Sequence, residues 1–326
     1  MTEPPGSLIG RSLRRVEDER LLRGRGRYVD DLPVEALEVA FVRSVHAHTR
    51  IVSIDVTSAL SMPGVATVYT AESMAGRMPP LLNTEELRVP PLLEEKVAPL
   101  VRIQPMPLRA EGEVILVGQP VAMVVASSRY LAEDAAEVVE VDYEPLPAVT
   151  DPDEALLPEA PRVLSGEDDN IGMHVRHGKG NADRAFAEAA VVVEDTFVSH
   201  RYVPSPLEPR GLVAQPDPFT GTLTIWSSTQ TPHRMRDHLA EALGVPNDDV
   251  RVVAVDTGGG FGQKGVLYVE ELLVPFAALE LGRAVRWVED RLENLTSSSH
   301  ARSRCTTSPR PPTATGASSP FGTGSW

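Results

Sequence analysis

Residues 256–264 read Asp-Thr-Gly-Gly-Gly-Phe-Gly-Gln-Lys, which places four glycines between two apolar runs. The run before them, residues 250–255, is rich in valine and predicts a buried strand. The run after them, residues 266–281, has apolar residues at helical spacing and ends at Gly282, which predicts a helix. A strand, a glycine turn and a helix start expose backbone N–H groups and the positive end of a helix dipole, so the stretch predicts an anion site. A tight connection without a ligand would use the same glycines.

The glycine turn also fits a second kind of protein. Residues 260–265, Gly-Phe-Gly-Gln-Lys-Gly, satisfy the pattern G-x-G-x-x-G of dinucleotide-binding folds. Glu289 and Asp290 follow the next strand-like run, residues 284–288, where such a fold places the acid that binds a ribose. A nicotinamide-dependent dehydrogenase that uses this turn is therefore an open alternative. The Walker pattern is excluded because Lys264 is followed by glycine rather than by serine or threonine.

The order of motifs around the turn is more specific than the turn alone. Thr-Gln-Thr-Pro at 229–232, a helical pattern, Gly-Val-Pro at 244–246, the valine run, the glycine turn and Gly-Arg-Ala-Val-Arg at 282–286 follow one another. This series resembles the first molybdopterin-binding domain of the xanthine dehydrogenase, aldehyde oxidase and carbon monoxide dehydrogenase large-subunit family. Upstream segments resemble the amino-terminal hammerhead domain of that family, namely residues 10–32, 43–60 and 117–149.

The resemblance implies an α+β fold in two parts, cut short at its carboxyl end. We expect an amino-terminal arm (1–21), a hammerhead-type α/β domain (22–150) and an incomplete first molybdopterin-binding domain (151–302) with a mixed sheet and helices. Residues 303–326 are mostly Ser, Thr, Pro and Gly. Because such a segment buries little apolar surface, we expect a disordered tail there. Its abrupt start favours a frameshifted or truncated reading frame.

The resemblance also implies which residues meet the cofactor. In the family, the dithiolene of a pterin holds the molybdenum, and the protein supplies position and polarity. The matching positions are Gln230, which reaches toward the oxygen ligand of the metal, and the glycine-rich backbone at Gly259, Gly260, Phe261 and Gly262. We therefore expect Gln230 and Phe261 beside the molybdenum and close together in space. Taken alone, Gln230 would more often be a solvated loop or cap residue.

Two further positions follow from the same match. Glu208, in Leu-Glu-Pro at 207–209, matches a family position, and a buried or turn-capping role is favoured there over that of catalytic base. Purine-oxidising members have a glutamate where this chain has Gly265, which favours a relative that oxidises an aldehyde or carbon monoxide. The catalytic glutamate of the family is expected in a carboxy-terminal part beyond this chain. No catalytic residue is assigned, and the chain alone is predicted to be inactive.

The resemblance implies a molybdenum–molybdopterin cofactor, in its cytosine dinucleotide form if the protein is bacterial. It implies oxidation of an aldehyde, an N-heterocycle or carbon monoxide by a hetero-oligomer whose partner subunits carry iron–sulfur clusters and FAD. The single cysteine, Cys305, excludes a cysteine-ligated cluster within this chain, so another subunit must hold such clusters. A non-catalytic scaffold subunit is the remaining alternative.

Composition is compatible with this interpretation. The 326 residues, 42% of them hydrophobic, suffice for two buried cores. The net charge of -15 disfavours nucleic acid and anionic membrane surfaces as partners and leaves a small-molecule substrate. No stretch has the apolar length of a signal peptide or of a membrane span, so we expect a cytoplasmic protein.

Overall fold

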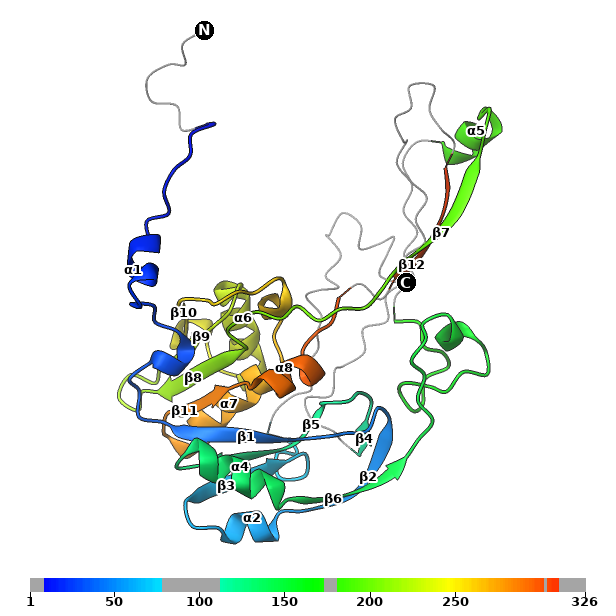
Figure 1. Ribbon diagram of the computed structural model, residues 1–326. Helices are drawn as coiled ribbons and strands as arrows, with labels where there is room; N and C mark the ends of the chain where they lie inside the picture. Colours follow the sequence, from blue (N-terminus) through cyan, green and yellow to red (C-terminus); the bar gives the residue numbers. More distant parts are fainter. Residues whose placement is uncertain (1–8, 78–111, 173–180, 302–303, 311–326) are drawn as a thin grey trace.

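A seven-stranded mixed sheet forms the centre of the computed structural model, which describes residues 9–77, 112–172, 181–301 and 304–310 (Figure 1). Its strand order is β10-β9-β8-β11-β1-β5-β3. The pairs β9–β10 and β1–β11 are parallel, and the other neighbours are antiparallel. The strands are β1 (Leu37–Arg43), β3 (Val65–Thr70), β5 (Pro120–Ala126), β8 (Gly211–Pro216), β9 (Leu223–Ser227), β10 (Val250–Ala254) and β11 (Val285–Val288).

This sheet is continuous across the domain boundary expected at residue 150. Strands β1, β3 and β5 come from the amino-terminal part, and β8 to β11 come from the carboxy-terminal part. The two groups join where Leu37 pairs with Val285 and Glu38 with Arg286. Arg286 also donates hydrogen bonds to the carbonyls of Leu32 and Val34, at 2.7 and 2.8 Å. The division into two domains stays a prediction, while the backbone pairing ties the two parts into one sheet.

Helices cover both faces of the sheet. Strand β5 shows this, because Met123 and Val125 belong to one apolar core, and Ala122 and Val124 belong to another. Alternate residues of a strand point to opposite faces, so a strand that is covered on both faces becomes a continuous apolar run. The first core packs against α6 (Pro232–Leu243) and α7 (Val269–Leu281), and the second packs against α2 (Thr57–Ser61) and α4 (Arg129–Glu137).

Two smaller sheets and several short helices complete the described residues. Strands β4 (Glu113–Val114), β2 (Thr49–Asp55) and β6 (Glu140–Pro145) form one sheet. The short helices are α1 (Asp18–Leu22), α5 (Ala182–Ala187), α8 (Arg291–Ser297), η1 (Val29–Asp31), η3 (Glu154–Leu156), η4 (Asn247–Asp249) and η5 (Gln263–Gly265). No helix within the described ranges has the length and apolar character needed to cross a membrane.

A two-stranded ribbon corrects the prediction for the end of the chain. Strand β7 (Val193–Ser199) pairs with β12 (Arg304–Arg310) along its whole length, and the ribbon projects from the body (Figure 1). The expectation of disorder from residue 303 is therefore wrong for residues 304–310. Pairing in a ladder satisfies backbone N–H and C=O groups, so it does not require an apolar composition. Residues 311–326 of the expected tail lie outside the described residues.

The region of the glycine turn matches the prediction only in part. Strand β10 ends at Ala254, close to the expected position. The helix expected from residue 266 begins instead at Val269, because the short helix η5 follows the glycines. The backbone N–H of Tyr268, at the start of α7, donates to the carboxylate of Glu271 at 3.0 Å. The helix start is therefore separate from the glycine turn, and the contribution of its dipole to an anion site there is not supported.

Candidate functional site

The candidate site lies where two parallel strands end. Strands β9 and β10 pair in register from Leu223 with Val250 to Ser227 with Ala254. Parallel strands that are paired in register end at the same edge of a sheet, so the two segments that follow them emerge side by side. The segment after β9 contains Gln230, and the segment after β10 is the glycine turn. This topology brings together residues that are far apart in the chain.

Gln230 and the glycine turn are in direct contact. The N–H of Gly262 donates to Oε1 of Gln230 at 3.1 Å, and the N–H of Gln230 donates to the carbonyl of Lys264 at 2.9 Å. A Cβ atom on Gly260 would lie 2.5 Å from Cδ of Gln230, so residue 260 must be a glycine for the amide to lie there. Because Oε1 accepts the Gly262 hydrogen bond, the amide orientation is defined, and Nε2 is the donor that remains.

Phe261 has an unusual backbone. Its φ of 53° is the only positive φ of a non-glycine residue among the described residues, and its side chain is 74% exposed. A bulky residue in the left-handed region is strained, and such strain persists where the surroundings hold it. The flanking Gly259 and Gly262 also have positive φ, at 101° and 89°. The five predicted contact residues thus form one surface, while their role in binding a cofactor stays a prediction.

Glu208 and Lys264 close the turn from its inner side. Oε2 of Glu208 accepts hydrogen bonds from the N–H of Gly258 at 2.7 Å and from Nζ of Lys264 at 2.9 Å. This geometry agrees with the turn-capping role favoured for Glu208. Lys264 is only 1% exposed, and burial lowers its pKa while the neighbouring Glu208 opposes that change. Sequence analysis did not assign Lys264 to the site.

A buried network anchors the same segment of chain to the sheet. Arg210 is fully buried, and its backbone N–H and Nε donate to Glu289 at 3.0 and 2.9 Å. Its Nη1 donates to Glu270 at 3.3 Å. Burial alone would lower the pKa of Arg210, but Glu270 and Glu289 outweigh it and raise that pKa.

The network argues against the dinucleotide alternative. Glu289, the acid expected to bind a ribose, is 2% exposed and also accepts a hydrogen bond from Asn294 at 2.8 Å. The carboxylate of Asp290 caps helix α8 by accepting from the N–H of Glu293 at 2.7 Å. Glu289 is therefore not available to a ribose hydroxyl, and Asp290 already serves as a helix cap. The sequence left this alternative open because it shows an acid after a strand but not its burial.

The amino-terminal arm reaches the turn from its outer side. Arg20 donates to the carboxylate of Asp256 from Nη1 and, at 2.7 Å, from Nη2, and the backbone N–H of Arg27 donates to the same carboxylate at 2.7 Å. These hydrogen bonds, that of Arg20 first, lower the pKa of Asp256 to about 2. The residue that begins the glycine turn is therefore held by the arm.

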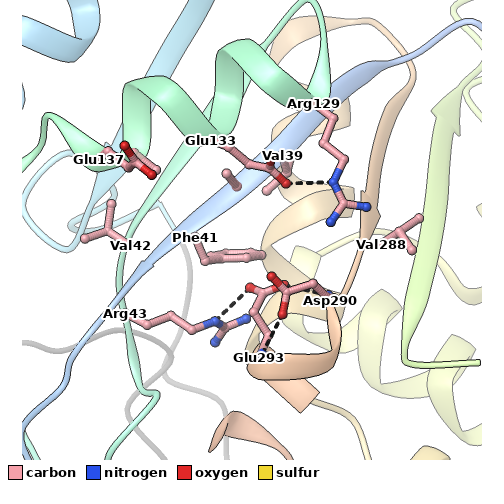
Figure 2. A pocket seen from close by; sticks show the side chains of 12 residues that line it. Val39, Phe41, Val42, Arg43, Arg129, Glu133, Glu137, Val288, Asp290 and Glu293 are labelled. Atoms are coloured by element: carbon pink, nitrogen blue, oxygen red, sulfur yellow. Dashed lines mark hydrogen bonds and ion pairs between the residues drawn. The ribbon is translucent and has the colours of Figure 1, made fainter. Parts of the chain in front are cut away.

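A hollow of about 310 Å³ lies apart from the turn, between β1, α4 and the start of α8 (Figure 2). Its two arginines pair with carboxylates that line it. Arg43 donates to Glu293 at 2.9 Å and Arg129 donates to Glu133 at 2.7 Å. Arg43 also donates to Glu270 at 2.6 Å, which links this hollow to the Arg210 network. None of its lining residues belongs to the glycine turn, so it is not part of the candidate site.

Comparison with known families matches both parts of the chain. Residues 23–147 match the aldehyde oxidase and xanthine dehydrogenase a/b hammerhead domain, and residues 164–308 match the molybdopterin cofactor-binding domain. The second match contains Gln230, the glycine turn, Glu208 and Lys264. It also extends past Arg302, where the sequence pattern was expected to break.

Individual relatives agree with these matches. The chain is 42% identical over 295 residues to the 6-hydroxypseudooxynicotine dehydrogenase complex subunit gamma of Paenarthrobacter nicotinovorans, covering 90% of this chain and 36% of the relative. It is 40% identical over 310 residues to the carbon monoxide dehydrogenase large chain of Afipia carboxidovorans, with the same coverage. The crystal structure of quinoline 2-oxidoreductase from Pseudomonas putida 86 superposes with a TM-score of 0.83 at 39% identity, covering 93% of this chain and 37% of that one. The chain thus spans little more than a third of the length of these relatives.

Proposed function

The chain belongs to the molybdopterin-binding large-subunit family of xanthine dehydrogenase, aldehyde oxidase and carbon monoxide dehydrogenase, and we propose that it forms one wall of the molybdenum site. In this proposal, Gln230 and the backbone of Gly259, Gly260, Phe261 and Gly262 contact the cofactor. The cofactor is a molybdenum–molybdopterin, and the cytosine dinucleotide form is the finer part of the proposal.

The orientation of the Gln230 amide carries the proposal. Its Oε1 accepts from the Gly262 N–H, so its Nε2 is left as a neutral donor at the turn that also holds the exposed Phe261. A neutral amide stabilises an oxygen atom that gains negative charge without adding a charge of its own. At Gly262 no described atom lies within 4 Å of the Cβ position, so a group can approach the backbone there. These residues therefore fit the oxygen side of such a cofactor, which supplies the oxidising power when it is bound.

The whole protein is proposed to hydroxylate a small molecule. Relatives are named for carbon monoxide, nicotine and quinoline, so an aldehyde, an N-heterocycle or carbon monoxide remains the substrate class. The relatives include a complex subunit gamma, a large chain and a large subunit, which supports a hetero-oligomer. Partners that carry iron–sulfur clusters and FAD, a catalytic base outside residues 1–326 and a cytoplasmic location belong to the same proposal. No observation favours the scaffold alternative.

A chimera tests this function. Residues 9–301 of this chain would replace the matching part of the Afipia carboxidovorans carbon monoxide dehydrogenase large chain, coexpressed with its partner subunits. We expect Gln230→Ala in that chimera to lower kcat by about 10²- to 10³-fold, as for the loss of one oriented donor. Gln215→Ala, at an exposed position at the end of β8, is the matched control and should leave kcat unchanged. Equal turnover in the two variants would contradict the proposed role of Gln230.

A further inference from the structure

Glu208 and Lys264 connect the inner side of the glycine turn to Gln230. We propose that these two residues are positioning residues, which fix the turn and the Gln230 amide in the arrangement that the site requires. Their value for the cofactor rests on the function proposed above, whereas their effect on the turn does not. The inference follows from the hydrogen bonds at the two ends of Lys264.

Lys264 joins two segments through different atoms. Its Nζ donates to Oε2 of Glu208 at 2.9 Å, while its carbonyl accepts from the N–H of Gln230 at 2.9 Å and from the hydroxyl of Thr229 at 3.4 Å. The next carbonyl, of Gly265, accepts from the hydroxyl of Thr231 at 3.1 Å. The segment that holds Gln230 is therefore hydrogen-bonded to the backbone of Lys264 and Gly265. A displacement of Lys264 must displace Gln230 as well.

Glu208 provides the fixed end of this connection. Its N–H donates to the carbonyl of Gly258 at 3.1 Å, and its carboxylate accepts from the N–H of Gly258, so the two residues bond in both directions. Arg291 of α8 donates to the carbonyls of Pro206 and Leu207 at 2.6 and 3.0 Å. Two residues further along, the buried Arg210 ties the chain to the sheet. The backbone on both sides of Glu208 is thus anchored independently of the turn.

Stability alone does not explain a lysine at this position. Its side chain is fully buried with one carboxylate partner, and a buried ion pair gives little net stabilisation relative to apolar side chains of similar volume. An ion pair does fix a distance and a direction, which an apolar contact does not. The turn needs such a constraint because Phe261 lies in the left-handed region, which is retained only where neighbouring contacts determine it.

We call the hydrogen bonds that join Glu208 to Lys264, and Lys264 to Gln230, the lock. Digestion with a lysine-specific protease tests it directly, because lysines stand at only three positions, Lys96, Lys179 and Lys264. In the parent chain the buried Lys264 should be cut far more slowly than in the unfolded chain. Glu208→Gln keeps an acceptor for Gly258 but removes the charge, and we expect cleavage after Lys264 to become about tenfold faster or more. Cleavage at Lys96 and Lys179 is measured in the same digest as the reference. The exposed Glu241→Gln on α6 is the matched control and should change none of the three rates.

Amide hydrogen exchange separates positioning from a local contact. The hydrogen bonds of Glu208 go to Gly258 and Lys264. The lock nevertheless predicts faster exchange of the Gly262 N–H in Glu208→Gln, since Gln230 is released. Glu208→Asp, which keeps the charge, should restore part of the protection at both sites. Lys264→Met, which fills the buried position but cannot bind Glu208, should also speed exchange at Gly262.

Unchanged exchange at Gly262 in folded Lys264→Met, or unchanged cleavage after Lys264 in Glu208→Gln, would overturn the inference. None of these measurements uses the cofactor. A chimera that fails to hold molybdenum would therefore count against the proposed function and leave the lock as it stands.

Discussion

Two charged residues of one short segment, Glu208 and Arg210, hold different parts of the molecule in place. Arg210 is wholly buried, binds two carboxylates and secures helix α7 and the end of β11 against the sheet. Glu208, two residues earlier, binds one lysine and one backbone N–H at the edge of the fold, and it secures only the glycine turn. The comparison indicates that stability and site geometry are set by separate side chains of residues 206–210. Substitutions should therefore affect them separately.

The largest expected effect is on the buried network. Arg210→Met removes the cation that faces Glu289 and Glu270 and leaves two buried carboxylates short of a partner. Breaking a buried ion pair in this way costs about 3 to 5 kcal/mol of unfolding free energy. Urea denaturation measures the loss, with the exposed Arg251→Met on β10 as the control. A loss no greater than that of the control would show that the network does not stabilise the fold.

The second expected effect is on the pH dependence of stability, and it distinguishes two neighbouring acids of α7. Arg210 and Arg43 outweigh burial and lower the pKa of Glu270 to about 2, whereas burial raises the pKa of Glu271 to about 7. The folded chain thus holds the Glu271 proton more tightly than the unfolded chain does. This contribution to stability is complete below the unfolded pKa near 4.5 and is lost as pH rises to about 7.

Glu271→Gln should remove that pH dependence. The amide keeps an oxygen for the N–H of Tyr268, so we expect the variant to gain about 1 to 3 kcal/mol over the parent at pH 8 and little at pH 4.5. Unfolding free energies measured in urea at several pH values check this. If the difference in unfolding free energy between variant and parent stays constant from pH 4.5 to pH 8, folding does not raise the pKa of Glu271.

The smallest effect is expected at the arm. Arg20→Ala removes an exposed partner of Asp256, and exposed ion pairs contribute little to stability because water and salt screen them. We expect the unfolding transition to stay where it is, while the amide of Arg27 exchanges faster because Asp256 is no longer held. A clear shift of the unfolding transition would mean that the arm stabilises the fold, as the Arg210 network does.

The sequence predicts the parts of this site that depend on local pattern. The valine run predicted β10. The glycine turn and the segment at 229–232 predicted that Gln230 lies close to the turn, and in the structure it contacts Gly262. The partnership of Glu208 and Lys264 could not be read in the same way, because it joins segments that meet only in the folded chain. The role of Glu289 could not be predicted for a related reason, since the sequence does not show whether an acid at the end of a strand is exposed or is buried against an arginine. A lysine among glycines directly after a buried strand was the available signal for Lys264.

The measurement that tests the central claim most directly is the molybdenum content of the chimera with Gly260→Val. A side chain at residue 260 meets the Gln230 amide, so the variant should disrupt the surface proposed to receive the cofactor while the fold is kept. Gly172→Val is the control, because no atom of the described residues lies within 4 Å of its Cβ position. We predict about one molybdenum per chain in the parent chimera and the control, and a severalfold lower content in Gly260→Val. Full molybdenum content and turnover in folded Gly260→Val would contradict the claim that Gln230 and the glycine turn form the wall of the molybdenum site.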